Sequence, residues 1–282
     1  MKKILFPTDF SEAADHAFVY ALNIADKLDA QITTVHAYHL PHVQAVRLPR
    51  TLKEVYDSIV IEEFENYRDH VPHLHEVAAA QGLSHVPVRH AMIEARQGVV
   101  RAILGVADRD EFDFIIMGTT GASGLREIFL GSVAAEMLEN ACCPVLAVPR
   151  KAVFDGRIDK IAMTTEFAPS EKQTLEQVMQ FAGEFEADVY VVHVDTSHTE
   201  QFAQRMQSYR KDLGEYPNLY FKVIDAISVE AALAQFIEEY RIDVLAMQTH
   251  KRNFIQELFT YSMTKKMAYH LRVPILAFQQ EG

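Results

Sequence analysis

The stretch DFIIMGTTGASGLREIFLGSVAAEMLENACCPVLAVP, from Asp113 to Pro149, decides the fold because the chain contains it twice. Its second copy is DVLAMQTHKRNFIQELFTYSMTKKMAYHLRVPILAFQ, from Asp243 to Gln279. Ten residues coincide at a constant shift of 130 positions. Average residue frequencies would give about two or three coincidences in a window of this length. The pattern therefore predicts a tandem duplication of one folding unit.

The beginning of each copy repeats in the same way. KKILFPTDF (2–10) matches DKIAMTTEF (159–167), and LDAQITTVHAY (28–38) matches FEADVYVVHVD (185–195), both at a shift of 157. Because the shift is smaller further along, the first copy carries 27 additional residues. We expect these residues to form a loop and a lengthened helix within 39–77.

Each copy alternates strand patterns with helix patterns. In the first copy, strands are expected near 4–7, 31–38, 86–93, 112–117 and 144–148, and helices begin after Ser11, at Val99 and at about Ser132. The strand runs are apolar on both faces, which is typical of a parallel sheet covered by helices. We therefore predict an α/β fold of two tandem doubly wound domains, 1–150 and 151–282. Each is expected to hold a five-stranded parallel sheet with flanking helices and to bind ligands at the carboxyl ends of its strands.

Two features of the predicted helices can be checked individually. Ser11 precedes the first helix, and Ser170 with Gln173 forms a capping-box pattern at the same place in the second copy. The lengthened helix carries an apolar stripe of Leu52, Val55, Ile59 and Phe64. This stripe predicts packing against the core or a domain interface rather than a groove for a partner.

Composition restricts the classes of partner. The 282 residues carry a net charge of −12, which disfavours nucleic acids and anionic membrane surfaces as partners. No run of eighteen apolar residues predicts a membrane span, and the opening MKKILFPTDF reads as a buried strand rather than a signal peptide. The two cysteines, Cys142 and Cys143, are adjacent, which favours packing in a reducing cytoplasm over a disulfide. We expect a cytoplasmic protein.

A glycine-rich loop follows the strand that ends at Gly118. Gly118 suits a close approach between backbone and ligand, and Gly131 with Ser132 opens a helix whose amides point outward. An anion there would meet backbone N–H groups and the hydroxyls of Ser123 and Ser132, so no lysine is required. The spacing is neither a P-loop nor the G-x-G-x-x-G fingerprint. A flexible turn is the alternative, but glycines spaced in this way after a strand favour nucleotide binding.

The spacing G-x2-G-x9-G-[ST], formed by Gly118, Gly121, Gly131 and Ser132, resembles the motif of the universal stress protein family in its tandem form. The resemblance covers nearly the whole chain, and the motif marks the ATP-binding branch of that family. The family's Pro-x-Asp turn after the first strand is matched at residues 7–9. The resemblance implies a Rossmann-like, adenine-nucleotide-alpha-hydrolase-like fold and an ATP-binding protein of stress response or signalling.

The resemblance also implies ligand residues. Asp9 would lie near the ribose or adenine, the backbone around Ala37 would contact the adenine, and Val133 would flank the ribose. The full predicted set is Pro7, Thr8, Asp9, Ala37, Met117, Gly118, Gly121, Ser123, Gly131, Ser132 and Val133. Thr119 and Thr120 depart from the arginine-containing pair common in the family. With only Arg126 nearby, a triphosphate implies Mg²⁺; ADP and AMP remain open as ligands.

Several alternatives stay open at the level of sequence. Asp9 suits a role at the N-terminus of the helix that Ser11 begins equally well. A slow ATP hydrolase or nucleotide-transferring enzyme on the same fold is the alternative function, although neither a catalytic triad nor a G-x-S-x-G elbow is evident. A metal site is the alternative role for a cluster of six histidines, namely His36, His39, His42, His70, His73 and His75. His36 recurs as His193, which favours a packing role at a strand end.

The second copy has a degenerate motif. Gly118, Gly121 and Gly131 become Gln248, Lys251 and Tyr261, and we therefore expect nucleotide in the first copy only. The last strands of the two copies, 145–148 and 275–278, are apolar edges. Antiparallel pairing of these edges would join the copies as a pseudo-dimer within one chain. A homodimer of the chain and a protein partner of the second copy are further expectations.

Overall fold

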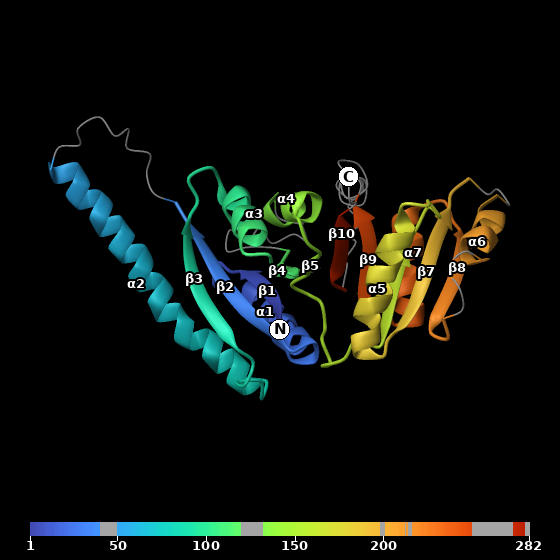
Figure 1. Cartoon of the computed structure of the whole chain (residues 1–282), viewed down its shortest axis with the longest axis horizontal. Coiled ribbons are helices and arrows are strands. Elements are labelled where there is room, and N and C mark those ends of the chain that lie inside the picture. The colour runs from blue at the N-terminus through green and yellow to red at the C-terminus, as the bar shows by residue number, and fades with distance from the viewer. Residues whose placement is uncertain are drawn as a thin grey trace.

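The computed structural model describes residues 1–39, 50–119, 132–197, 201–211, 213, 216–249 and 273–279, with backbone alone for 50–59. Its strands form one ten-stranded sheet in the order β3-β2-β1-β4-β5-β10-β9-β6-β7-β8 (Figure 1). The strands are β1 (Lys2–Pro7), β2 (Ala30–Tyr38), β3 (Val88–Glu94), β4 (Phe114–Gly118), β5 (Val145–Val148), β6 (Lys160–Thr164), β7 (Asp188–Asp195), β8 (Leu219–Asp225), β9 (Val244–Thr249) and β10 (Ile275–Gln279). The helices are α1 (Glu12–Leu28), α2 (Arg50–Ala80), α3 (Val99–Arg109), α4 (Ser132–Asn140), α5 (Glu171–Phe185), α6 (Gln201–Lys211) and α7 (Val229–Tyr240).

Each half of the sheet is a five-stranded parallel unit. Strand pairs within a half are all parallel, and the order 3-2-1-4-5 of the first half is repeated as 8-7-6-9-10 in the second. The halves meet where β5 and β10 pair antiparallel, with Leu146 opposite Leu276. The predicted fold class and the predicted pairing of these two strands are both confirmed.

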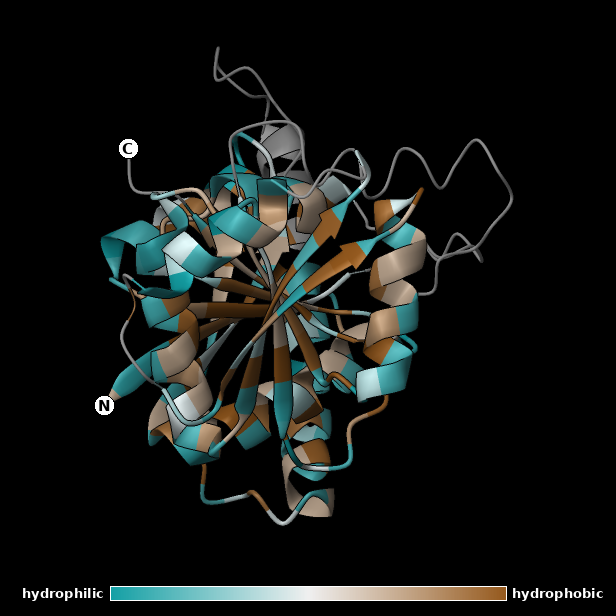
Figure 2. Ribbon diagram, turned by 90° about the vertical axis from the view of Figure 1, so that its right-hand side faces the viewer, coloured by the Kyte–Doolittle hydropathy of each residue, from teal (hydrophilic) through white to brown (hydrophobic). Residues whose placement is uncertain are grey.

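Helices cover both faces of the sheet. Helices α1, α5 and α6 and part of α2 bury one face, and α3, α4 and α7 bury the other. Figure 2 shows the hydrophobic strands crossing between these two helix layers with progressive twist. Both cores contain residues of both halves, and Phe114 lies 5.9 Å from Phe181 across the junction, measured between ring centres. The two copies therefore share their hydrophobic cores.

Residues that recur in both copies hold the sheet together. Asp113 accepts a hydrogen bond from the backbone N–H of Lys3 at 2.7 Å, and Asp243 accepts one from Lys160 at 2.8 Å. The side chain of Lys3 donates to the carbonyl of Asp110 just after α3, and that of Lys160 donates to the carbonyl of Tyr240 at the end of α7. The repeated aspartate–lysine pairs therefore fix the start of the first strand of each half against the strand that becomes its neighbour.

The two predicted helix caps differ in outcome. Ser11 accepts a hydrogen bond from Ala14 N at 3.3 Å and caps α1, as expected. The capping box predicted from Ser170 and Gln173 is wrong, because Ser170 has a helical backbone and its side chain makes no capping bond. The buried carboxylate of Glu171 binds the amides of the turn before α5 instead.

Helix α2 accounts for the extra length of the first half. It spans 31 residues where α6 spans 11, so the predicted lengthened helix is confirmed. Figure 1 shows it running along the outer side of β3. The packing predicted for its apolar stripe is wrong at Phe64, which is 56% exposed beside Ile61 at 58%. The side chains of the other stripe residues lie outside the described part of the chain.

The second half of α2 packs on α1 through an ion pair and a buried leucine. His73 Nε2 lies 2.7 Å from an Asp15 carboxylate oxygen, and Leu74 is fully buried. The hydrogen bond to Asp15 raises the pKa of His73 above its usual value. The contact between His73 and Asp15 therefore helps to hold α2 against α1, more strongly when the imidazole is protonated.

We expect replacement of His73 by glutamine to remove a pH-dependent part of the stability. The contribution of the pair is present below about pH 6.5, the pKa of an unfolded histidine, and is lost as pH rises through the raised folded pKa. For a half-exposed pair, about 0.2–1 kcal/mol is expected. Denaturation curves of both proteins at pH 6 and pH 8.5 measure it; a difference that grows with pH would contradict the assignment.

The segment between the halves is packed rather than extended into solvent. Phe154 lies against Tyr20 of α1 with ring centres 4.3 Å apart, and Ala152 and Ile158 are buried. Of the two free cysteines, Cys143 is buried and Cys142 is exposed. Burial raises the pKa of the Cys143 thiol to about 12, so this residue acts as packing, as expected. None of the described helices is both long and apolar enough to cross a membrane.

Candidate functional site

The strand order places a topological switch point at the carboxyl ends of β1 and β4. From β1 the chain winds outward through β2 and β3, and from β4 it winds the other way to β5. Connections therefore leave these two adjacent strands in opposite directions, which opens a crevice in doubly wound folds. Beyond the strands, Thr8 N donates to Val35 O at 2.9 Å and Thr119 N donates to Val148 O at 3.0 Å. Both strand ends are thus fixed to their outer neighbours.

The turn after β1 is held in an unusual conformation. Phe10 has a φ of 57°, a left-handed conformation that non-glycine residues rarely adopt. Its N–H donates to Thr8 Oγ1 at 3.0 Å, and His36 Nδ1 donates to Thr8 O at 2.9 Å. Asp9 Oδ1 accepts hydrogen bonds from the amide and the hydroxyl of Ser11. Asp9 therefore supports the start of α1, one of the two roles that the sequence left open.

The predicted ligand residues that the structure describes lie on four elements. Pro7, Thr8 and Asp9 end or follow β1, Met117 and Gly118 end β4, Ala37 lies in β2, and Ser132 and Val133 begin α4. Strands β1 and β4 are parallel neighbours, with Ile4 opposite Phe114 and Leu5 opposite Ile115. Gly121, Ser123 and Gly131 lie outside the described residues. The two strand ends are therefore brought together, while the phosphate-loop assignments stay predictions from sequence.

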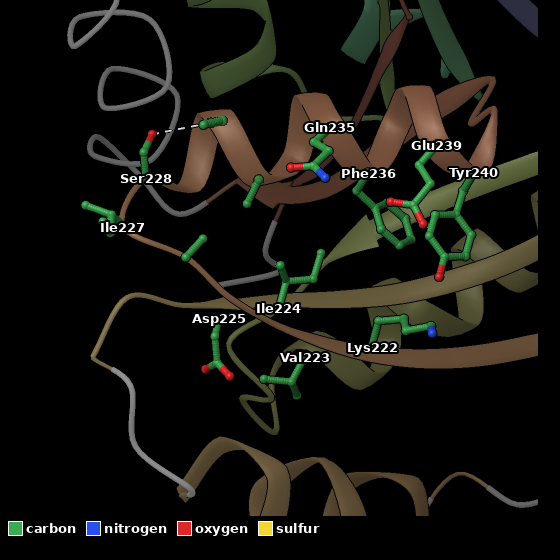
Figure 3. Close-up of a pocket in the computed structure, with 13 residues that line it drawn as sticks. Lys222, Val223, Ile224, Asp225, Ile227, Ser228, Gln235, Phe236, Glu239 and Tyr240 are labelled. Carbon is green, nitrogen blue, oxygen red and sulfur yellow. Dashed lines mark hydrogen bonds between the residues drawn. The ribbon is translucent and has the colours of Figure 1, made fainter.

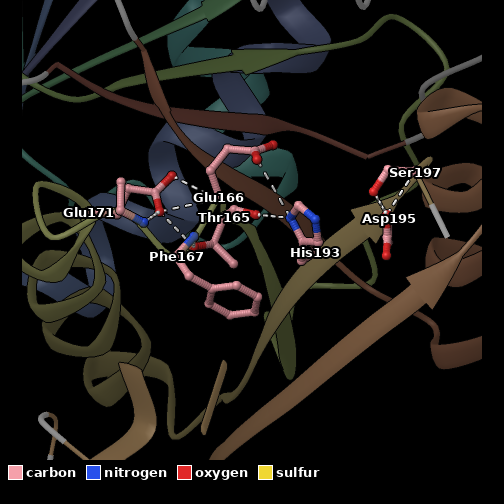
Figure 4. Close-up of polar contacts among 8 residues, drawn as sticks. Thr165, Glu166, Phe167, Glu171, His193, Asp195 and Ser197 are labelled. Carbon is pink, nitrogen blue, oxygen red and sulfur yellow. Dashed lines mark hydrogen bonds and ion pairs between the residues drawn. The ribbon is translucent and has the colours of Figure 1, made fainter. Parts of the chain in front are cut away.

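The second half rebuilds the same turn after β6. Phe167 has a φ of 57° and donates its N–H to Thr165 Oγ1 at 2.8 Å, while His193 Nδ1 donates to Thr165 O at 2.7 Å (Figure 4). His36 and its counterpart His193 thus have the same role: each holds the turn at the end of the first strand of its half, as the sequence favoured. The turn is a scaffold common to both copies, independent of which ligand residues each copy carries.

Side chains fill the cleft of the second half. Gln248 occupies the position of Gly118 and donates to Ser170 O at 3.1 Å, which ties the end of β9 to the start of α5. Glu171, 4% exposed, stands where the first half has Ala14 and accepts hydrogen bonds from Thr165 Oγ1 and two amides of the turn. The remaining cavity measures about 70 Å³. Ligand sites for molecules of nucleotide size need several hundred Å³.

The polar contacts of the clustered histidines go to different groups. His36 donates to the Thr8 carbonyl, His73 binds Asp15, and the ring of His75 lies 5.2 Å from that of His90. Within the described ranges, no three histidine, cysteine or acidic side chains are grouped to hold a metal ion. His42 lies outside those ranges.

A groove of about 800 Å³ lies elsewhere, between β8 and α7 (Figure 3). Phe236 and Tyr240 line it with Lys222, whose ammonium nitrogen lies 5.5 Å from the centre of the Tyr240 ring. Asp225 and Glu239 also line it, so its charge is mixed. It follows an edge strand instead of the crevice between β6 and β9, and it has no glycine among its lining residues. We do not assign it to nucleotide.

Comparison with known proteins gives consistent results. A family model described as the universal stress protein family matches residues 1–149. A universal stress protein of Methanocaldococcus jannaschii is 34% identical over 151 residues, which cover 53% of this chain and 82% of that protein. A putative universal stress protein of Staphylococcus saprophyticus is 29% identical over 169 residues, covering 59% of this chain and 93% of its own.

The likeness extends to the second half at the level of fold. The crystal structure of a universal stress protein from Archaeoglobus fulgidus matches 99% of this chain and 98% of its own, with a TM-score of 0.70 and 17% identity. At that identity the match shows the fold alone, over both copies. The family model matches more than half of the sequence, and the Methanocaldococcus jannaschii protein is 34% identical. The chain therefore belongs to the universal stress protein family.

Proposed function

We propose that the first half binds ATP, with Mg²⁺, between the carboxyl ends of β1 and β4, and that the protein acts in stress response or signalling without appreciable turnover. The observation that carries the proposal is the contrast at one position. Gly118 ends β4 without a side chain, whereas Gln248 bridges the matching crevice of the second half. A backbone that approaches a phosphate or ribose requires the first arrangement and excludes the second.

The charge of the site supports Mg²⁺ as the companion of the nucleotide. None of the predicted ligand residues is cationic, and Asp9 contributes a carboxylate. Oxygen donors such as Asp9 and Ser132 suit a hard cation that arrives with the phosphates. Because α4 begins at Ser132, its N-terminal amides supply the positive end of a helix dipole.

The arrangement of the halves completes the proposal. We infer that residues 1–150 and 151–282 form two domains that act as an intrachain pseudo-dimer, with β5 and β10 as its interface. The second domain then serves as a scaffold and a surface for a protein partner, and a homodimer of the chain is a further possibility to test. Both cysteines are free thiols, in keeping with the cytoplasmic location that we propose.

Calorimetric titration with Mg·ATP tests the binding, and we expect one site per chain. Mass spectrometry of the supernatant after denaturation identifies any nucleotide that copurifies. Two equivalent sites, or no binding of any adenine nucleotide, would overturn the proposal. Single-turnover incubation separates the hydrolase alternative: steady product formation that disappears when Asp9 is replaced by asparagine would favour the enzyme.

A further inference from the structure

The turn that carries Asp9 is contacted by α2, an element that the ligand motif does not include. The ring of Phe10 stacks against that of His36 with centres 5.0 Å apart and planes 30° apart. On α2, His70 stacks against the same Phe10 ring at 4.7 Å and 22°, and Tyr67 meets it edge-on at 5.7 Å. The Phe10 ring is thus packed between aromatic rings of β2 and α2.

His70 is itself fixed in orientation. Its Nδ1 donates to the carbonyl of Asn66 one turn earlier at 2.7 Å, so its ring lies along α2 with one face toward Phe10. Tyr67 is buried, and Leu74, two turns later, is fully buried. This part of α2 is therefore anchored, and the stacking partner of Phe10 is presented from a rigid surface.

The backbone of Phe10 is strained, so the ring contacts that stabilise it also affect the position of the neighbouring Asp9. A left-handed backbone at a non-glycine residue costs on the order of 1–2 kcal/mol and persists only where the surroundings impose it. Stacked aromatic pairs contribute about as much. The stack from α2 therefore adds a stabilisation of the same order as the strain, on top of the hydrogen bonds that Phe10 N and His36 Nδ1 make in this turn. Because Asp9 directly precedes Phe10, relaxation would displace its carboxylate.

We propose that His70 is a positioning residue for the nucleotide site, acting on Asp9 through its stack with Phe10. This inference rests on the proposed nucleotide binding of the first half. In the second half the equivalent Phe167 has the same φ, and Tyr209 of α6 meets its ring at 5.7 Å, as Tyr67 meets Phe10. The ring that stacks there at 4.0 Å is Phe202 of α6, and it lies on His193 instead of on the phenylalanine. Stacking of a helix histidine on the phenylalanine of the turn is therefore found in the half that has the glycine motif.

The test compares variants by Mg·ATP titration on the full chain. H70A should weaken binding about 2- to 12-fold, the factor that corresponds to one aromatic pair. H70F keeps a ring that can stack and should bind within about twofold of the unmodified protein. H75A is the matched control, because His75 lies on the same helix, is exposed and contacts His90 over β3. It should leave affinity unchanged.

A double-variant cycle separates positioning from general loosening of α2. In an F10L background, H70A should add no further loss, since the group through which it acts is gone. Unchanged affinity in H70A, an equal loss in H75A, or additive losses in the double variant would each overturn the role of His70 while leaving nucleotide binding intact. Absence of binding in the unmodified protein would overturn both. Melting temperatures of all variants confirm that they are folded at the temperature of titration.

Discussion

Replacing Gly118 with glutamine should abolish nucleotide binding, with a loss of affinity of about 100-fold or more, or roughly 2.7 kcal/mol. The substitution transfers to β4 the side chain that closes the cleft of the second half, where Gln248 reaches Ser170 O at 3.1 Å. At Gly118 the new side chain would span from the strand end toward the start of α1. The position lies in a strand, a conformation that glutamine adopts without strain, so the fold should be retained. Calorimetry with Mg·ATP measures the loss.

Two controls sharpen this result. Gly105 of α3 is exposed, and a Cβ built there meets no atom within 4 Å, so G105Q should bind nucleotide like the unmodified protein. The reverse change, Q248G, should not create a second site. Glu171 still occupies that cleft, and the sequence has Lys251 and Tyr261 where the motif needs glycines. Undiminished binding by G118Q would show that nucleotide does not approach the end of β4.

The fold could be predicted from the sequence because each copy carries its own pattern and the two copies support one another. Apolar runs predicted the strands. Because 145–148 and 275–278 would otherwise be exposed apolar edges, they predicted their own antiparallel pairing, which the structure has. Residues that recur proved to be scaffold: Asp113 with its counterpart fixes strand starts, and His36 with its counterpart fixes the turn. Among the predicted ligand residues, the three motif glycines differ between the copies, whereas Thr8, Met117 and Ser132 recur as Thr165, Met247 and Ser262.

Failures of prediction came from features that depend on tertiary contacts. The stripe on α2 predicted burial at Phe64, but a helix of 31 residues is about 46 Å long, whereas the seven residues of β3 span about 23 Å. The helix is therefore longer than the strand beside it, and among its described side chains Ile61 and Phe64 are exposed instead of packed on the sheet. Ser170 matched a capping pattern, but the turn amides donate to Glu171, and a carboxylate is a stronger acceptor than a hydroxyl.

The stack of His70 on Phe10 illustrates what a sequence pattern omits. The two residues lie 60 positions apart, and α2 has no alignable counterpart in the shorter second copy. The one available signal was that phenylalanine recurs at positions 10 and 167 beside the more obvious Thr and His matches. The repeated phenylalanine indicated that the ring matters. Its partner His70 could be identified only from the packing of α2 against the turn.

The second large effect expected is on stability, at Glu171. Its carboxylate accepts hydrogen bonds from Thr165 Oγ1 at 2.6 Å, Ala168 N at 2.9 Å and Glu166 N at 3.1 Å; the first bond is buried and the two amide bonds are partly buried. In E171A these donors lose their acceptor, and an unsatisfied buried donor costs about 1–3 kcal/mol. Allowing for water entry, we expect the free energy of unfolding to fall by about 3–5 kcal/mol.

Urea denaturation followed by circular dichroism measures this change, since the chain contains no tryptophan for a fluorescence readout. Glu176 is exposed on the same helix, so E176A should alter stability by no more than about 0.5 kcal/mol. The first half carries Ala14 at the matching position and satisfies its turn through Ser11 and Asp9 instead. The copies thus stabilise one turn in two ways: the first uses Asp9 and Ser11, whereas the second places the carboxylate of Glu171 in the crevice. A loss below about 1 kcal/mol in E171A would contradict this division, because Glu171 would then be dispensable and the closed cleft would need another cause.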